Sequence, residues 1–175
     1  MRRYLELLTG IVSGSDCTQD ITVNLQMESM KGEDIVDDTT WIAKSHSPWH
    51  MTFAPIFYAQ KIILVVRNPL DSIISWLHLC STQTHCAKAP FDFEKEYPNY
   101  FDFWLKDQGS YLVDWMKVMM NDSKFRKVPM LWIRFEDLVM NPEPELTNIM
   151  RFLLGKKDLT GTNAERRIKE VIAKG

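Results

Sequence analysis

A basic residue followed by a helix-starting sequence stands near the middle of the chain. The apolar run of residues 61–66 ends at Arg67, and residues 68–71 follow as Asn, Pro, Leu and Asp. Asparagine caps helix N-termini, proline suits the first helical position, and an aspartate in the first turn favours the helix dipole. The free N–H groups of such a terminus and the guanidinium fork of arginine both favour a phosphate-like anion. The pattern predicts an anion site at Arg67, to which the hydroxyls of Ser72 and Ser75 can contribute.

A second group with chemical potential is the pair Lys44 and His46, which follows a β-prone run. Strand alternation sends both side chains to the same face. An imidazole with a reference pKa of about 6.5 beside an ammonium group is suited to proton abstraction near neutrality. Structural alternatives stay open for these residues, because Arg67 can pair with Asp71 and a single histidine is often part of the packing.

The elements that must hold these residues alternate along the chain. β-prone and apolar runs predict buried strands at residues 39–44, 61–66 and 128–134. Apolar side chains at helical spacing predict helices at residues 3–11, from Pro69, at 99–120, between Pro142 and Gly155, and at 163–174. The remaining segments include turns at residues 13–16 and 135–138, an acidic solvated loop at 33–38, and an excursion with one short helical turn at 80–98. This order predicts an α/β layered domain with a mostly parallel sheet, in which ligands bind beyond the carboxyl ends of the strands.

The three segments that follow the predicted strands resemble the sulfotransferase family in order and spacing, over about residues 2–154. They are Lys44-Ser45-His46-Ser47-Pro48, Arg67-Asn68-Pro69-Leu70-Asp71 with Ser75 eight residues after the arginine, and Arg134-Phe135-Glu136-Asp137-Leu138 ahead of a proline-started helix. The resemblance implies one sulfotransferase domain over residues 1–175, with a three-layer P-loop-like fold and a mostly parallel central sheet. It also implies transfer of a sulfuryl group from 3′-phosphoadenosine 5′-phosphosulfate to an acceptor hydroxyl or amine.

The resemblance assigns a role to each matching residue. Arg67 and Ser75 would hold the 3′-phosphate of the donor, and Phe135 would stack on the adenine. His46 would be the general base that removes the acceptor proton, and Lys44 would place positive charge near the transferring group. The acceptor can be a small molecule, a glycan or a protein.

The chain departs from the family pattern at its beginning. The family's strand and 5′-phosphosulfate loop precede the first helix, whereas this chain begins at Met1-Arg2-Arg3-Tyr4, already past them. We therefore expect an N-terminally truncated domain that lacks the first strand and the phosphate loop, and a chain that is inactive alone.

Composition limits the partners and the class of protein. With 45% hydrophobic and 25% charged residues, the chain is of ordinary globular composition. A net charge of -2 predicts neither nucleic acid nor an anionic membrane as a main partner, and no apolar run reaches the roughly 18 residues of a membrane span. Three cysteines, an odd number, favour reduced thiols and a cytoplasmic location, with the Golgi lumen as the alternative if an anchor precedes the chain.

Three other interpretations are weaker on the residues themselves. A zinc site of His78, Cys80, His85 and Cys86 lacks the repeated paired spacing of structural sites, so no metal is expected. A P-loop phosphotransferase would need a glycine-rich loop ending in lysine, which the chain lacks. A non-catalytic relative that binds a nucleotide or a protein partner remains an alternative.

Overall fold

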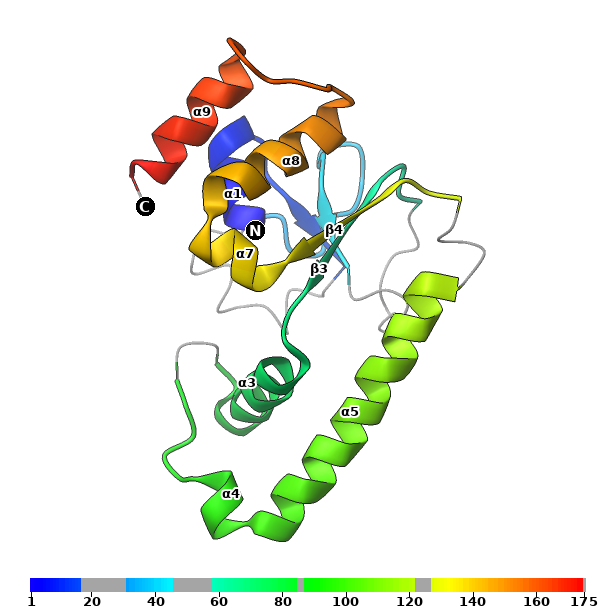
Figure 1. Ribbon diagram of the computed structural model, residues 1–175, viewed down its shortest axis with the longest axis vertical. Coiled ribbons are helices and arrows are strands. Elements are labelled where there is room, and N and C mark those ends of the chain that lie inside the picture. Colours follow the sequence, from blue (N-terminus) through cyan, green and yellow to red (C-terminus); the bar gives the residue numbers. More distant parts are fainter. Residues whose placement is uncertain (17–30, 46–57, 85–86, 122–126, 175) are drawn as a thin grey trace. The chain divides into compact units, whose positions relative to one another are not determined.

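The computed structural model describes residues 1–16, 31–45, 58–84, 87–121 and 127–174. Figure 1 shows helices and strands of an α/β architecture with small sheets, the class that the sequence predicts. The helices are α1 (Arg2–Thr9), α3 (Pro69–Thr82), α4 (Phe93–Glu96), α5 (Pro98–Asn121), α7 (Phe135–Met140), α8 (Pro142–Leu154) and α9 (Asn163–Ile172). The strands are β1 (Gly14–Ser15), β2 (Ala43–Lys44), β3 (Ile62–Val66) and β4 (Met130–Arg134). Within the ranges given, no helix has the length and apolar character needed to span a bilayer.

The chain separates into two compact units. One unit, called the terminal unit below, joins Met1–Val65 to Val128–Gly175, and the other, the central unit, is Val66–Lys127. The central unit contains α3, α4 and α5, and the remaining helices and β1, β2 and β4 belong to the terminal unit.

The strands pair in two parallel sheets of two strands each. In the first sheet, Gly14 of β1 lies opposite Ala43 of β2, and Ser15 lies opposite Lys44. In the second sheet, the N–H of Ile62 donates to the carbonyl oxygen of Pro129, just before β4, at 2.9 Å. Because this bond joins the beginnings of β3 and β4, these two strands also run in the same direction.

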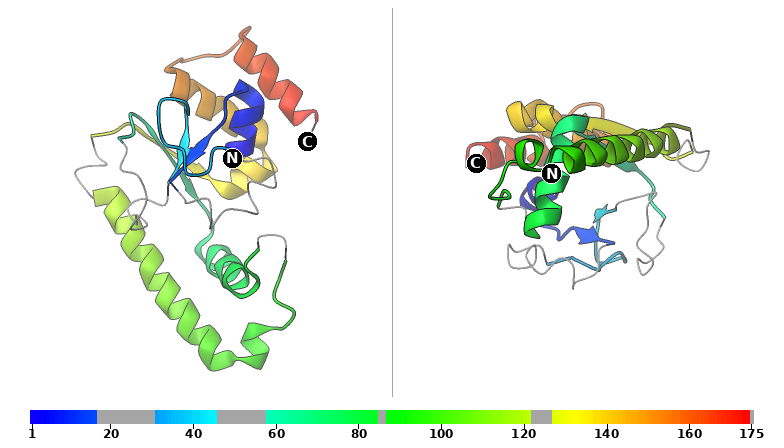
Figure 2. Two further views of the ribbon diagram at one scale, coloured as in Figure 1. Left: turned by 180° about the vertical axis from the view of Figure 1, so that it is seen from behind. Right: turned by 90° about the horizontal axis from the view of Figure 1, so that it is seen from below.

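The core of the terminal unit is apolar and built mainly from helices. Helix α9 packs against α8 and α1, and α7 packs against α8 and β4 (Figure 2). The buried side chains come from all four helices, from β4 and from one loop residue; they are Leu5, Leu8, Ile133, Leu138, Leu146, Ile149, Met150, Leu159, Ile168 and Val171. Each fully buried aliphatic side chain of this kind contributes about 1.5–3 kcal/mol relative to exposure.

Local signals at the ends of α8 behave as predicted. Pro142 occupies the first turn, and Gly155 ends the helix in a left-handed conformation with φ 64°. The ammonium group of Lys61 donates to the carbonyl oxygens of Phe152 at 2.7 Å and Leu153 at 2.9 Å, which satisfies acceptors that the helix end leaves open.

The predicted strand at residues 39–44 is too long. Only Ala43–Lys44 is extended and paired, because the residues before it form a turn around Asp37. The Asp37 carboxylate accepts from the N–H of Thr39 at 2.9 Å and also from its hydroxyl, and the Thr40 N–H donates to the Asp37 carbonyl at 3.1 Å. The bonds from the Thr39 hydroxyl and the Thr39 N–H lower the pKa of the Asp37 carboxyl below its ordinary value. Such local side-chain bonds compete with a strand for the backbone.

Two predicted turns are wrong as well. Residues 135–138 begin helix α7, whose first turn carries Glu136 and Asp137 and whose Leu138 is buried in the core. Packing of Leu138 therefore decides the local conformation. The turn at residues 13–16 contains strand β1, which is extended because it pairs with β2.

In the described residues of the central unit, the short helix α4 lies between α3 and α5 in the chain. The long predicted helix is confirmed as α5, and the single helical turn expected within residues 80–98 is α4. The indole N–H of Trp104 on α5 donates to the carbonyl oxygen of Ile73 on α3 at 3.2 Å. Phe93 of α4 packs edge-on against Phe91, with ring centroids 4.7 Å apart. Aromatic packing thus connects α4 to its neighbours.

Two glycines allow the backbone around β1 to pack closely. A Cβ on Gly14 would overlap the carbonyl oxygen of Ile35, and a Cβ on Gly32 would overlap that of Ser13. By contrast, a Cβ on Gly109 of α5 would meet no atom within 4 Å. The loop of residues 32–35 can therefore approach β1 only because positions 14 and 32 lack side chains.

We predict that Gly14→Ala and Gly32→Ala each lower the free energy of unfolding by about 1–3 kcal/mol, since backbone atoms must shift. The matched variant Gly109→Ala should raise it by up to about 1 kcal/mol, because alanine is the better helix former. Urea denaturation followed by circular dichroism measures all three. A Gly14→Ala protein as stable as the unmodified one would contradict this account of β1.

Candidate functional site

The predicted anion site lies at the N-terminus of α3, in the central unit. The side-chain oxygen of Asn68 accepts from the N–H of Leu70 at 3.0 Å, Pro69 stands in the first turn, and Asp71 follows, so the predicted cap is confirmed. Arg67 precedes this cap and is solvent-exposed. A helix terminus with an exposed guanidinium beside it has the charge and the donors that an anion requires.

Ser75 lies on the solvent-exposed side of α3. Ile73 and Leu77 turn toward the interior of the protein, and Ser75, between them in sequence, is exposed. Because successive residues on a helix are rotated by 100°, Ser75 lies on the face of α3 opposite to that of Ile73 and Leu77. The structure thus places Arg67 just before α3 and Ser75 on α3, in one unit and both solvent-exposed.

Lys44 is the last residue of β2 in the terminal unit. Its carbonyl oxygen accepts from the N–H of Asp16 at 3.0 Å, and the residue is half-buried. The short β1–β2 ladder therefore holds the Lys44 backbone. His46, the predicted base, lies outside the described residues, as do the serine and the proline that follow it.

Phe135 begins α7 directly after β4 and is 38% exposed. The preceding Arg134 lies 3.9 Å from Glu136 and 3.9 Å from Asp137. Such exposed ion pairs contribute little stability. Lys44 and Phe135 thus both stand at carboxyl ends of parallel strands of the terminal unit, which is where ligands bind in sheets of this type.

The sequence of the chain matches the family model described as "Sulfotransferase domain" over residues 26–173. The chain belongs to the sulfotransferase domain family. No solved structure matches it. The matched region contains Lys44, His46, Arg67, Ser75 and Phe135. Membership supports sulfuryl transfer as the general chemistry, and the family generally uses 3′-phosphoadenosine 5′-phosphosulfate as the sulfate donor.

The alternative zinc site can be compared with the structure at two of its residues. The imidazole Nδ1 of His78 accepts from the N–H of Ala89 at 3.2 Å, and burial raises the pKa of the Cys80 thiol. Residues 85 and 86 lie outside the described ranges. Within those ranges, no group of three or more His, Cys, Asp or Glu side chains could hold a metal ion.

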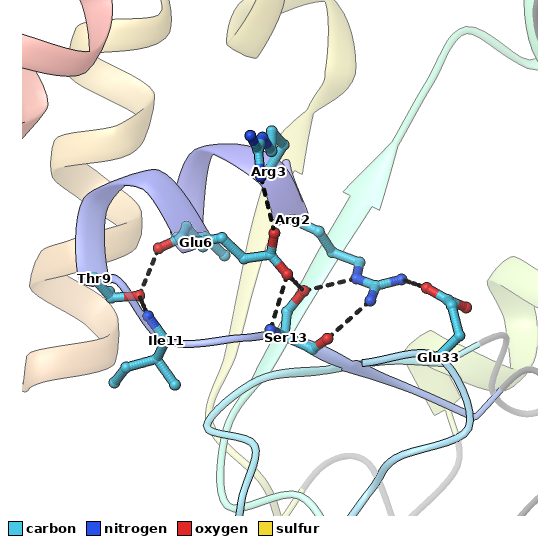
Figure 3. Close-up of polar contacts among 8 residues, drawn as sticks. Arg2, Arg3, Glu6, Thr9, Ile11, Ser13 and Glu33 are labelled. Atoms are coloured by element: carbon cyan, nitrogen blue, oxygen red, sulfur yellow. Dashed lines mark hydrogen bonds and ion pairs between the residues drawn. The ribbon is translucent and has the colours of Figure 1, made fainter. Parts of the chain in front are cut away.

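A buried polar network in this sulfotransferase domain escaped the sequence analysis (Figure 3). The guanidinium of Arg2 on α1 forms an ion pair with Glu33, and it donates to the hydroxyl and to the carbonyl oxygen of Ser13 at 2.9 Å each. The Ser13 N–H and hydroxyl donate in turn to a Glu6 carboxylate oxygen, at 2.9 and 2.7 Å. The side chain of Glu33 is 0% exposed, so the prediction of a solvated acidic loop is wrong for this residue.

No spacing rule would have found this pair, because 31 positions separate Arg2 from Glu33. The one local sign is Gly32, whose missing side chain lets the loop approach Ser13 closely. A glycine beside an acidic residue is too common in loops to predict burial.

We predict that Asn68→Ala lowers the free energy of unfolding of the α3 region by about 1 kcal/mol, because the N–H of Leu70 loses its acceptor. Asn68→Asp should keep the cap and most of the stability. Hydrogen exchange at the Leu70 amide reports the change locally. Equal exchange rates in the alanine variant and the unmodified protein would exclude a capping role.

Proposed function

We propose that this protein transfers a sulfuryl group from 3′-phosphoadenosine 5′-phosphosulfate to an acceptor hydroxyl or amine. The observation that carries the proposal is the capped N-terminus of α3 directly after the exposed Arg67, in a chain that belongs to the sulfotransferase domain family. A phosphate finds there both a guanidinium and the positive end of the helix dipole.

In this proposal Arg67 and Ser75 bind the 3′-phosphate of the donor, the arginine through charge-assisted bonds and the serine through its hydroxyl. Phe135 stacks on the adenine, since an exposed aromatic ring at a strand end offers an apolar face. Lys44 places its ammonium group near the transferring sulfuryl group, where negative charge must be stabilised.

The reaction itself is a displacement at sulfur. His46 takes the proton from the acceptor oxygen or nitrogen, that atom forms a bond to sulfur, and the bond between sulfur and the 5′-phosphate oxygen breaks. The electron pair leaves with adenosine 3′,5′-bisphosphate, and the protonated imidazole later releases its proton to water. Positioning and electrostatic stabilisation provide the catalysis, because the protein forms no covalent bond to the group.

The organisation that goes with this function is a single sulfotransferase domain of the three-layer P-loop-like type. We place the acceptor among small molecules, glycans and proteins, and the protein in the cytoplasm.

We predict that Arg67→Ala weakens the binding of adenosine 3′,5′-bisphosphate by about 10- to 100-fold, as expected when charge-assisted hydrogen bonds to a phosphate are lost. Isothermal titration calorimetry measures the affinity. The control is Arg166→Ala, which removes an exposed arginine that pairs with Glu170 on α9 and should leave the affinity unchanged. A normal titration curve for the Arg67 variant would remove this residue from the site.

A further prediction concerns the base. In the protein as its gene encodes it, His46→Ala should abolish the transfer of labelled sulfate from the donor while the affinity for adenosine 3′,5′-bisphosphate is retained. Undiminished turnover would disprove the role of His46. Binding of the nucleotide without any transfer by the unmodified protein would favour a non-catalytic relative.

A further inference from the structure

The Arg2 network surrounds a strand of only two residues, β1, and it is connected to Lys44 through the backbone. The N–H groups of Gly14 and Asp16 donate to the carbonyl oxygens of Ile42 and Lys44, at 2.6 and 3.0 Å. On the opposite edge of β1, the Ser15 N–H donates to the Ile35 carbonyl at 3.2 Å. Strand β1 thus lies between β2 and the loop that contains Glu33.

A ladder this short cannot determine its own register. In a strand, neighbouring side chains point to opposite faces, so a slip of one residue would exchange the places of Ala43 and Lys44. Packing that is independent of the ladder must therefore select the observed register. The ends of β1 offer such packing through Ser13, which immediately precedes the strand.

Arg2 can select the register because it binds two segments at once: Ser13, which precedes β1, and Glu33, in the loop on the other edge of β1. Three donors of one guanidinium contact the Ser13 hydroxyl, the Ser13 carbonyl oxygen and the Glu33 carboxylate. The rigid fork of arginine holds these groups in one geometry, which the single ammonium group of lysine cannot do.

Arg2 and Glu33 are both buried, so each depends on the other for compensation of its charge. The Arg2 side chain is 10% exposed and that of Glu33 is 0% exposed. The second carboxylate oxygen of Glu33, Oε2, is buried with no hydrogen-bond partner in the part of the chain that the structure describes. Losing Arg2 while the loop keeps its place would therefore leave a buried carboxylate without compensation, so the observed position of the loop depends on Arg2.

We propose that Arg2, Ser13 and Glu33 form a positioning network that sets the register of β1 against β2 and thereby places Lys44 for sulfuryl transfer. Its functional part rests on the role of Lys44 in the proposed function. Arg2 and Glu33 act through the backbone of β1 and touch no reacting group.

The test compares Arg2→Lys with the unmodified protein, and Arg166→Lys on the exposed face of α9 serves as the matched control. Hydrogen exchange at the Gly14 and Asp16 amides reports how readily the bonds of the observed register open. We expect Arg2→Lys to speed both exchange rates at least about tenfold, since opening of the short ladder becomes easier, and the control to leave them unchanged. Unchanged rates in Arg2→Lys would overturn the proposal.

A second readout concerns Lys44 itself. Acylation of the Lys44 amine is followed by mass spectrometry with and without 3′-phosphoadenosine 5′-phosphosulfate. We expect the donor to protect Lys44 in the unmodified protein and in the control, and to lose this effect in Arg2→Lys while the affinity for adenosine 3′,5′-bisphosphate stays the same. Equal protection in Arg2→Lys would contradict the positioning role. Absence of protection in the unmodified protein would instead refute the proposed role of Lys44, and the exchange rates would then decide the register alone.

A double variant separates positioning from stability. Arg2→Met together with Glu33→Leu replaces the buried pair by apolar side chains, a change that often restores or raises stability. We expect the double variant to melt close to the unmodified protein, whereas Glu33→Gln alone lowers the melting temperature by about 10 °C. Exchange at Gly14 and Asp16 should stay fast in the double variant, because Ser13 has lost its bonds to Arg2. Recovery of slow exchange together with stability would show that the pair only stabilises the fold.

Discussion

A buried ion pair between the first helix and a loop about thirty residues later organises the amino-terminal part of this protein. Removing two charges from water is costly, and the attraction between them offsets that cost only when the geometry is good and other hydrogen bonds are made. Arg2 meets this condition by donating to Ser13 as well as to Glu33. The pair therefore joins α1, the residue before β1, and the loop of residues 32–35 into one arrangement that two glycines make sterically possible.

The candidate site has a different physical origin. At the start of α3, the anion site follows from chemistry within a few residues: a capping asparagine, a proline in the first turn and an arginine just before them. Such a site needs little tertiary support, because the helix provides the N–H groups and the dipole. Lys44, in contrast, depends on a two-residue ladder, and hence on packing that originates elsewhere in the chain.

Sequence reasoning succeeded where signals were local. It predicted the cap at Asn68, the end of α8 at Gly155, the long helix α5 and the strand that precedes Arg67. It failed where distant contacts decide the conformation. Residues 135–138 were predicted as a turn but are helical, since Leu138 is buried in the core where α7 packs against α8 and β4. Residues 39–40 belong to a turn around Asp37 instead of a strand.

The sequence by itself determined the family, the order of the three motifs and the helix start that makes Arg67 a candidate for phosphate binding. The helix start depends on residue types within a few positions of one another, the range over which propensity and capping act. The family and the motif order depend on the spacing of three such local segments along the chain. Only the tertiary structure decided that Glu33 is buried, that residues 14–15 form a strand, and that the Lys44 backbone is held by Asp16. The physical reason is that burial depends on partners far along the chain, and the 31 positions between Arg2 and Glu33 carry no periodic signal that could announce their contact.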